Sequence, residues 1–192
     1  DVEPLAAIPF FLIIFALIEE VFKFGAAYFT VRKSPAFNEP VDAMIYTVVA
    51  SLGFATLENF GALNLDRPGE TIVLSNALEI ISLRFIGATL LHTLTSGVVG
   101  YYWARSIRAF GDKKFIFWGL ALATALHVAF NYFIIKYENL FYPVILVMLA
   151  GFFVLNDFEK LKRQKPKKRI RQLTCQILPT RSSCLFSKNC CQ

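Results

Sequence analysis

The sequence predicts an all-α protein, a polytopic bundle of about five transmembrane helices. Of its 192 residues, 56% are hydrophobic and 18% are charged, whereas soluble domains carry about 25% charged residues. Five apolar stretches have lengths close to the roughly 20 helical residues that cross a bilayer core. Because backbone groups that face lipid must be hydrogen-bonded internally, stretches of this kind are expected to be helices. The composition excludes a disordered chain, a disulfide scaffold and an ordinary soluble enzyme.

Each of the five predicted crossings has its own polar content. The crossings are expected at residues 5–31, 42–65, 85–104, 115–135 and 139–156. The first is interrupted by three charged residues, the second contains one glutamate, and the third and fourth contain one histidine each. Residues 71–83, ahead of the third crossing, form either a separate interfacial helix or an extension of it. Proline and glycine in the connections, such as Pro35, Pro40, Pro68 and Gly111, are typical of loops.

The basic residues predict the orientation of the bundle. Lys and Arg gather in the first and third loops and after the fifth crossing, while the second and fourth loops have one each. Basic loops mark the cytoplasmic side, so the N-terminus is expected outside and the C-terminus in the cytoplasm. Residues 1–156 carry a net charge of −2 (10 basic, 12 acidic) and residues 157–192 carry +8 (10 basic, 2 acidic).

This charge division predicts two regions, a helical domain at 1–156 and a basic, disordered cytoplasmic tail at 157–192. The tail is expected to contact anionic lipid headgroups, and nothing in the charge pattern of the helical domain indicates a nucleic-acid partner. The chain begins with Asp1 and not with methionine, so we expect that an upstream piece precedes it in the natural protein.

Six ionisable residues lie inside apolar segments, where they are costly. They are Glu19, Glu20, Lys23, Glu58, His92 and His127. If each is comparable to a central Asp, Lys or Arg, the set costs on the order of 10 kcal/mol unless the side chains satisfy one another. Intramembrane ionisable residues therefore indicate a functional site in the interior of the bundle. Residue counts along each predicted helix place that site at mid-membrane or nearer the outside.

The spacing of these residues suggests how they work together. Lys23 follows Glu19 by four residues and Glu20 by three, so its ammonium can lie against either carboxylate on one helix face. The other carboxylate is then free to act as a general base or acid. His127 and Asn131 are four residues apart and present an imidazole and an amide on a shared face. The spacing leaves open which glutamate pairs with Lys23.

Taken in order, these motifs resemble those of the PrsW family of intramembrane proteases. That family belongs to the broader group of type II CAAX prenyl endoproteases and bacterial CPBP/Abi proteins. The resemblance covers residues 10–135. It rests on Glu19-Glu20-x-x-Lys23, Gly53-Phe54-Ala55-x-x-Glu58-Asn59, Arg84 through His92, and His127-x-x-x-Asn131.

The resemblance implies hydrolysis of a peptide bond in or near the membrane, with glutamate as the base. It implies that Glu20 or Glu19 activates a water molecule, that His92 orients this water, and that His127 and Asn131 stabilise the tetrahedral intermediate. Glu58 completes the polar cluster, and Lys23, Asn59 and Arg84 support it. The implied substrate is a membrane protein or peptide, such as a single-span anti-sigma factor, and the implied location is a prokaryotic plasma membrane.

Other interpretations of the same residues stay open. Glu20, His92 and His127 would suffice to bind a catalytic zinc ion, but the chain has no H-E-x-x-H motif, and we favour metal-free chemistry without a cofactor. Buried Glu and His chains also form proton relays, so a proton- or cation-coupled transporter is an alternative. An inactive protease-like immunity or interaction protein is a further one.

Overall fold

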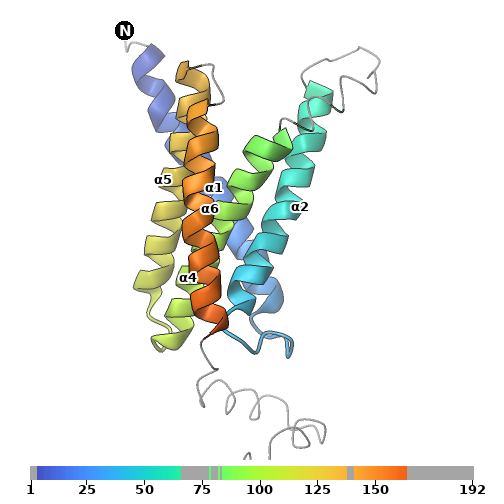
Figure 1. The fold of residues 1–192 in the computed structure, drawn as a ribbon, viewed down its shortest axis with the longest axis vertical. Coiled ribbons are helices and arrows are strands. Elements are labelled where there is room, and N and C mark those ends of the chain that lie inside the picture. Colours follow the sequence, from blue (N-terminus) through green and yellow to red (C-terminus); the bar gives the residue numbers. More distant parts are fainter. Residues whose placement is uncertain (1–3, 66–77, 79–81, 83, 138–140, 164–192) are drawn as a thin grey trace, which may run out of the picture.

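The structure, a computed structural model, describes residues 4–65, 78, 82, 84–137 and 141–163. Within these ranges the chain is helical and contains no strand, which confirms the predicted all-α class. Five long helices lie side by side (Figure 1). They are α1 (Pro4–Val31), α2 (Asp42–Leu65), α4 (Leu90–Arg108), α5 (Lys113–Tyr137) and α6 (Phe141–Lys162), and a π-helical turn, η1 (Phe85–Thr89), leads into α4.

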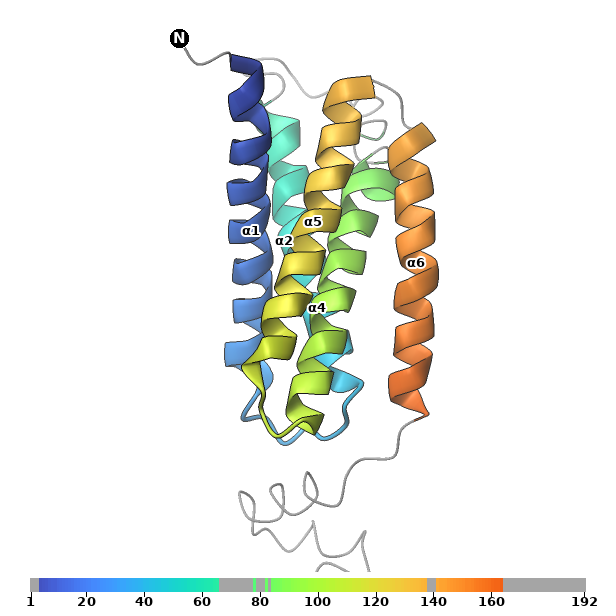
Figure 2. The ribbon, with the colours of Figure 1, turned by 90° about the vertical axis from the view of Figure 1, so that its left-hand side faces the viewer.

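Helix α4 is the centre of the bundle. It packs against α1, α2, α5 and α6, while α1 and α6 lie at opposite edges of the view in Figure 2. Consecutive helices run in opposite directions, so the start of α1 and the start of α6 lie at one end of the bundle (Figures 1 and 2). The α1–α2 and α4–α5 loops lie at the other end. We call the first end the α1-start end and the second the loop end.

The observed helix bounds agree with the predicted crossings to within a few residues. The second crossing begins and ends as predicted, and α4, α5 and α6 each extend beyond the predicted end. Helix α6 continues to Lys162 and therefore passes the domain boundary predicted at residue 156. Most of the segment predicted at 71–83, and the tail from residue 164 onward, lie outside the described residues.

In the part of the chain that the structure describes, three helices are long and apolar enough to cross a membrane, namely α2 over Asp42–Ala62, α5 and α6. The remaining two carry more polar residues: α1 contains two glutamates and a lysine, and α4 contains several Ser and Thr residues and ends with Arg105 and Arg108. Large apolar side chains, such as Phe22 and Phe29 on α1, are about 70% exposed on the outer surface of the bundle. An apolar surface of this extent marks a membrane or protein contact. Five crossings and their orientation stay predictions.

Glycine brings α4 close to its neighbours. A Cβ atom added at Gly100 would lie 2.6 Å from the Met44 Cα and 2.8 Å from the Ala43 carbonyl oxygen on α2. On α5, a Cβ added at Gly119 would lie 2.7 Å from the Tyr102 Cβ on α4. Small residues at such positions let helix backbones approach in a membrane, where apolar attraction between helices is weak. This close approach sets the helix spacing at which side chains from different helices can meet.

We therefore expect Gly100→Ala to destabilise the bundle, because the new methyl group would overlap backbone atoms of α2 that cannot move aside independently. Overpacking of this kind costs about 1–3 kcal/mol. The matched control is Gly61→Ala on α2, where an added Cβ has no neighbour within 4 Å. Thermal unfolding in detergent, followed by circular dichroism, should show a lower midpoint for Gly100→Ala only. Equal midpoints for the two variants would contradict the assigned packing.

Candidate active site

The centre of the site is a buried ion pair on one face of α1. The Lys23 Nζ lies 2.6 Å from the Glu20 Oε1, and the two residues are 3% and 1% exposed. Their spacing of three residues places both on the same helix face. This contact settles the pairing that the sequence left open: Glu20, and not Glu19, is the carboxylate that holds the lysine.

Side chains from α4 and α5 complete the surroundings of Glu20. The Thr95 hydroxyl donates a hydrogen bond to the Glu20 Oε1 at 3.0 Å. The His127 Nδ1 lies 2.9 Å from the same oxygen. A carboxylate only accepts, so the proton of this bond belongs to the His127 Nδ1. Glu20 thus fixes the orientation and tautomer of His127, as the acidic member of a catalytic triad does for its histidine.

Lys23 also fixes the state of His92. Its Nζ lies 3.0 Å from the His92 Nδ1. An ammonium only donates, so the His92 Nδ1 must be the acceptor and the ring proton must be on Nε2. That Nε2 lies 2.6 Å from the Glu58 Oε2 on α2 and donates to it. One cation therefore links the two halves of the site, with Glu20 and His127 on one side and His92 and Glu58 on the other.

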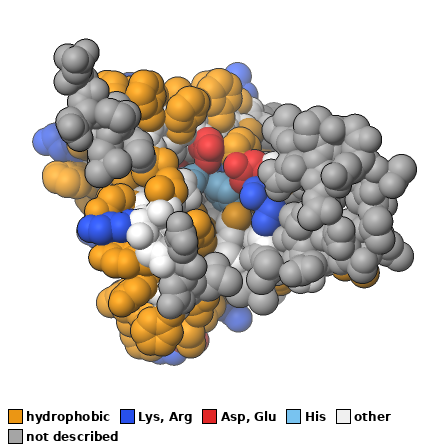
Figure 3. Space-filling view, turned by 90° about the horizontal axis from the view of Figure 1, so that it is seen from above, with side chains coloured by type: hydrophobic (Ala, Val, Ile, Leu, Met, Phe, Trp, Pro, Cys, Tyr) orange, Lys and Arg blue, Asp and Glu red, His pale blue; other side chains and the backbone are white. Residues whose placement is uncertain are grey.

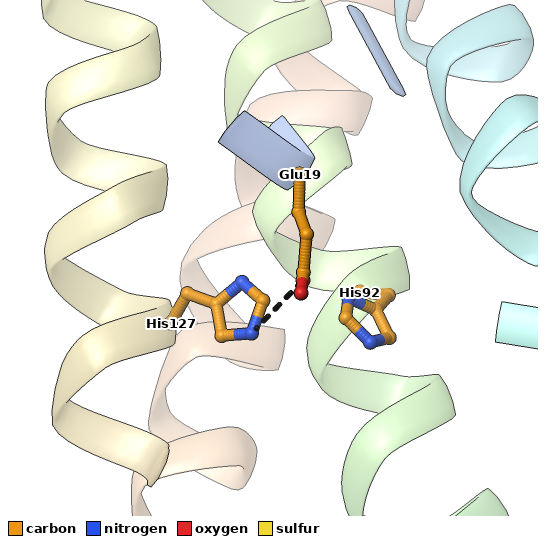
Figure 4. A group of neighbouring side chains, drawn as sticks. All are labelled: Glu19, His92 and His127. Atoms are coloured by element: carbon orange, nitrogen blue, oxygen red, sulfur yellow. Dashed lines mark ion pairs between the residues drawn. The ribbon is translucent and has the colours of Figure 1, made fainter. Parts of the chain in front are cut away.

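Glu19 differs from Glu20 in its surroundings. Its side chain is 25% exposed, and its Oε2 lies 3.5 Å from the His127 Nε2. Figure 4 shows the Glu19 carboxylate extending toward the His127 and His92 rings. The Glu19 Oε2 and the Glu20 Oε2 are both buried and have no hydrogen-bond partner among the described residues, but only the Glu19 side chain is partly exposed. A buried, unpartnered carboxylate oxygen beside an imidazole nitrogen is well placed to accept a proton from a bound water.

A second network links Glu58 on α2 to Arg84 and to η1, which leads into α4. The Arg84 Nε donates to the Asn59 Oδ1 at 2.8 Å, and the Asn59 Nδ2 donates to the Thr89 Oγ1 at 3.2 Å. The Arg84 Nη2 lies 3.7 Å from the Glu58 Oε2. These contacts join α2 to η1 one turn before His92. The supporting roles expected of Asn59 and Arg84 stay predictions.

Asn131 stands apart from this arrangement. It is half-buried on α5, one helical turn beyond His127. The hydrogen bonds between described residues connect it to none of the other candidate residues, and its role toward a bound substrate stays a prediction. Two residues that the sequence analysis did not identify, Thr95 and Thr89, contact the site directly. Each lies three residues from His92, a spacing that could have suggested a shared helix face.

The site opens toward the α1-start end of the bundle. His127 precedes the end of α5 by ten residues and Glu58 precedes the end of α2 by seven, which correspond to depths of about 15 Å and 10 Å at 1.5 Å per residue. Seen from this end in Figure 3, acidic and histidine side chains are visible together near the middle of the surface, with hydrophobic side chains above and to the left of them and Lys or Arg side chains beside them. Under the predicted orientation this end faces outward.

Three of these residues are close enough to hold a metal ion, with one ligand atom each from Glu19, His92 and His127 within 4.8 Å of one another. This set differs from the zinc set expected from the sequence, which had Glu20 in place of Glu19. The Glu20 Oε1 is bonded to Lys23, Thr95 and His127.

The hydrogen bonds of His92 test whether this set suits an ion. A metal on the His92 Nε2 would leave the ring proton on Nδ1, which would then face the Lys23 ammonium donor to donor. The usual partner of a metal-bound histidine is an acceptor, such as a carboxylate or a carbonyl. The arrangement fits an ion at Glu19 and His127 but not at His92, and catalytic zinc sites use three protein ligands.

Comparison with known proteins relates this site to a family. A sequence profile described as "PrsW family intramembrane metalloprotease" matches residues 2–155. The chain belongs to the PrsW family. PrsW membership and the three membrane-length helices identify it as a membrane protein.

Individual PrsW relatives agree with this assignment. The chain is similar to the protein named Protease PrsW of Geobacillus kaustophilus, with 31% identity over 136 residues, 70% of this chain and 56% of that relative. It is 29% identical over 154 residues to Protease PrsW of Halalkalibacterium halodurans, covering 79% and 67% of the two chains. It is 24% identical over 149 residues to Protease PrsW of Bacillus subtilis, an alignment that covers 76% of this chain and 63% of that relative. The chain thus spans a little over half to two thirds of the length of these relatives, and no solved structure matches it.

The buried ion pair makes a prediction about stability. Lys23→Met should leave the Glu20 carboxylate buried without its counter-ion, which costs about 3–5 kcal/mol. Removing the charge as well, in Lys23→Met/Glu20→Gln, should recover part of this loss, because no unpaired ion remains. Unfolding of both variants in detergent, with denaturant, measures the difference. A double variant no more stable than Lys23→Met would show that Glu20 does not depend on Lys23.

Proposed function

We propose that this PrsW-family protein is an intramembrane endopeptidase that hydrolyses a peptide bond in or near the membrane-spanning part of its substrate. The single observation that supports the proposal most directly is the Glu19 Oε2, which is buried, unpartnered among the described residues and 3.5 Å from the His127 Nε2. The relatives named as proteases support the same class of reaction.

In this proposal Glu19 is the base. A water bound between the Glu19 carboxylate and the His127 Nε2 would lose its proton to Glu19 as its oxygen attacks the carbonyl carbon. The same proton would then pass to the leaving amide nitrogen, which restores the Glu19 carboxylate. General acid–base catalysis of this kind contributes about 10²–10⁴-fold to the rate.

His127 has the second role. Its Nδ1 proton is held by Glu20, so a positive charge on the ring would be stabilised by a buried carboxylate 2.9 Å away. In this proposal His127 enters the step with a proton on each ring nitrogen, and its Nε2–H donates first to the bound water and then to the developing oxyanion; Asn131 is the proposed second donor. One such donor in a site that excludes water is worth about 2.7–4 kcal/mol. Both ring nitrogens of His92 are engaged, by Lys23 and by Glu58, so His92 would act on the water through these partners and not through a direct hydrogen bond.

The substrate is proposed to be a single-span membrane protein, and an anti-sigma factor fits this description. Because the site opens at the α1-start end, the scissile bond would have to reach about 10–15 Å into the bundle from that end. A helical peptide has its amides bonded internally, so it must unwind locally before its carbonyl can be attacked. We therefore expect a bond near a helix end or a helix-breaking residue.

The two glutamates give this proposal a sharp test. Glu19→Gln should lower cleavage of a single-span reporter by about 10²–10⁴-fold while leaving thermal unfolding unchanged, since the Glu19 Oε2 accepts no hydrogen bond from the described residues. Glu20→Gln should lower the unfolding midpoint as well, because Lys23 loses its carboxylate. Glu159→Gln, an exposed carboxylate at the far end of α6, is the control and should affect neither. Wild-type cleavage by Glu19→Gln would eliminate Glu19 as the base.

Metal dependence has a separate test. The family description includes a metal ion, whereas the hydrogen bonds of His92 favour chemistry by the side chains alone. We expect purified protein to cleave the reporter after exhaustive chelation, with less than one equivalent of zinc by elemental analysis. Activity that is lost on chelation and restored by added zinc would show that a metal is required. A chain that never cleaves, but transports ions in proteoliposomes, would support the transporter alternative.

A further inference from the structure

A second site lies at the loop end of the bundle, opposite the opening of the candidate active site. A cavity of about 700 Å³ is enclosed by α1, the α1–α2 loop, the end of α4 and the start of α5. Its inner wall is aromatic. The Trp103 ring stacks on Phe37 at 4.8 Å and meets Phe24 and Tyr28 at 5.6 and 5.5 Å between ring centroids. Trp103 itself is 3% exposed, so its place in this wall is fixed by packing.

The mouth of the cavity is basic. Arg32, Lys33 and Lys113 line it, and Glu39 is the acidic residue among its lining, which leaves a net charge of +2 (three basic, one acidic). The three basic side chains are exposed. The Arg32 guanidinium lies over the Tyr28 ring, 5.0 Å from its centroid. The cavity therefore combines an apolar interior with a cationic rim.

The loop that forms one wall is held in place by its own hydrogen bonds. The Asp42 Oδ2 accepts from the backbone N–H groups of Asn38 and Glu39 at 2.8 and 2.7 Å. The Ser34 hydroxyl oxygen accepts from the Ala36 N–H at 3.2 Å. A preformed wall lowers the ordering cost of binding, which favours a ligand site over an accidental gap.

The depth of the cavity indicates what kind of ligand fits. Its lining extends along α1 from Arg32 back to Phe24 and along α5 from Lys113 to Leu120. At 1.5 Å per residue these stretches are about 12 Å and 10 Å long. A free phosphate would use only the rim. A molecule with an anionic head and an apolar chain would use the rim and the interior together.

We propose that this cavity binds one anionic phospholipid. Its phosphate lies among Arg32, Lys33 and Lys113, and one acyl chain lies between Phe24 and Leu120. The predicted orientation places this end of the bundle in the cytoplasmic leaflet, which is the anionic one. The proposed lipid site is formed by α1, α4 and α5 at the loop end and does not include the basic tail. It does not depend on the proposed protease activity.

Tryptophan fluorescence can test the site directly, because the chain has only two Trp residues and Trp118 is exposed on α5. In the full chain with Trp118→Phe, Trp103 becomes the sole reporter. The protein is placed in phosphatidylcholine vesicles that contain brominated phosphatidylglycerol or, in parallel, the same fraction of brominated phosphatidylcholine. We expect stronger quenching of Trp103 by the anionic lipid. Equal quenching by the two headgroups would overturn the proposal without any further variant.

Two charge-matched variants then locate the site. Arg32→Gln/Lys33→Gln/Lys113→Gln should abolish the preference for the anionic lipid. The control, Lys114→Gln/Lys160→Gln/Arg163→Gln, removes the same charge from the same end of the bundle but from residues that do not line the cavity, and it should keep the preference. The assignment is contradicted if the control variant loses the preference for the anionic lipid, or if the Arg32→Gln/Lys33→Gln/Lys113→Gln variant retains it.

The last measurement repeats the quenching experiment with added inorganic phosphate at constant ionic strength. If the site binds a lipid, Trp103 should still be quenched more strongly by the anionic lipid. Loss of this difference would identify a site for free anions instead. Thermal unfolding of each variant in detergent verifies that it is folded before quenching is compared.

Discussion

The buried Lys23 ammonium is the interaction on which the rest of the site depends. It donates to the Glu20 carboxylate on its own helix and to the His92 imidazole on α4. Inside an apolar bundle a lone ammonium or carboxylate would be very costly, whereas each is tolerated when paired and hydrogen-bonded. Because an ammonium can only donate, it sets the tautomer of His92 and thereby the direction of the bond to Glu58. A single charge on α1 thus orders polar groups on α2, α4 and α5.

This arrangement separates two adjacent glutamates into different roles. Successive residues on a helix point about 100° apart, since a turn holds 3.6 residues. Glu20 therefore faces the centre of the bundle, where three donors bond to its Oε1, while Glu19 is partly exposed and places its Oε2 near the His127 Nε2. Each carboxylate keeps an Oε2 without a hydrogen-bond partner among the described residues, but only that of Glu19 belongs to a partly exposed side chain. The inner carboxylate contributes stability and orientation, and the outer one remains available for chemistry. The structure explains in this way how two neighbouring charges in one helix of the bundle can have different roles.

The sequence predicted the helical class, five helices and the convergence of their ionisable residues, because hydrophobic length and the cost of buried charge act locally. It could not decide between Glu19 and Glu20, since that choice depends on how α1 is rotated against α4 and α5. It also missed Thr95 and Thr89, whose hydroxyls matter only at the observed helix spacing. That spacing results from close contacts such as the one at Gly100, which depend on two helices at once. Asn131 shows the opposite case: its spacing places it one turn from His127 on α5, but the hydrogen bonds between described residues do not connect the two.

The two ends of the bundle are connected through one turn of α1. Lys23 holds the ion pair of the candidate active site, and the next residue, Phe24, forms part of the aromatic wall at the loop end through its contact with Trp103. The position of α1 along and around its axis is therefore fixed twice, by a directional polar contact and by an aromatic one. A shift that improved one contact would strain the other, because adjacent residues cannot rotate independently within a helix. The polar site consequently has a rigid support at the opposite end of the bundle from its opening, and precise placement of Glu19 and His127 requires such a support.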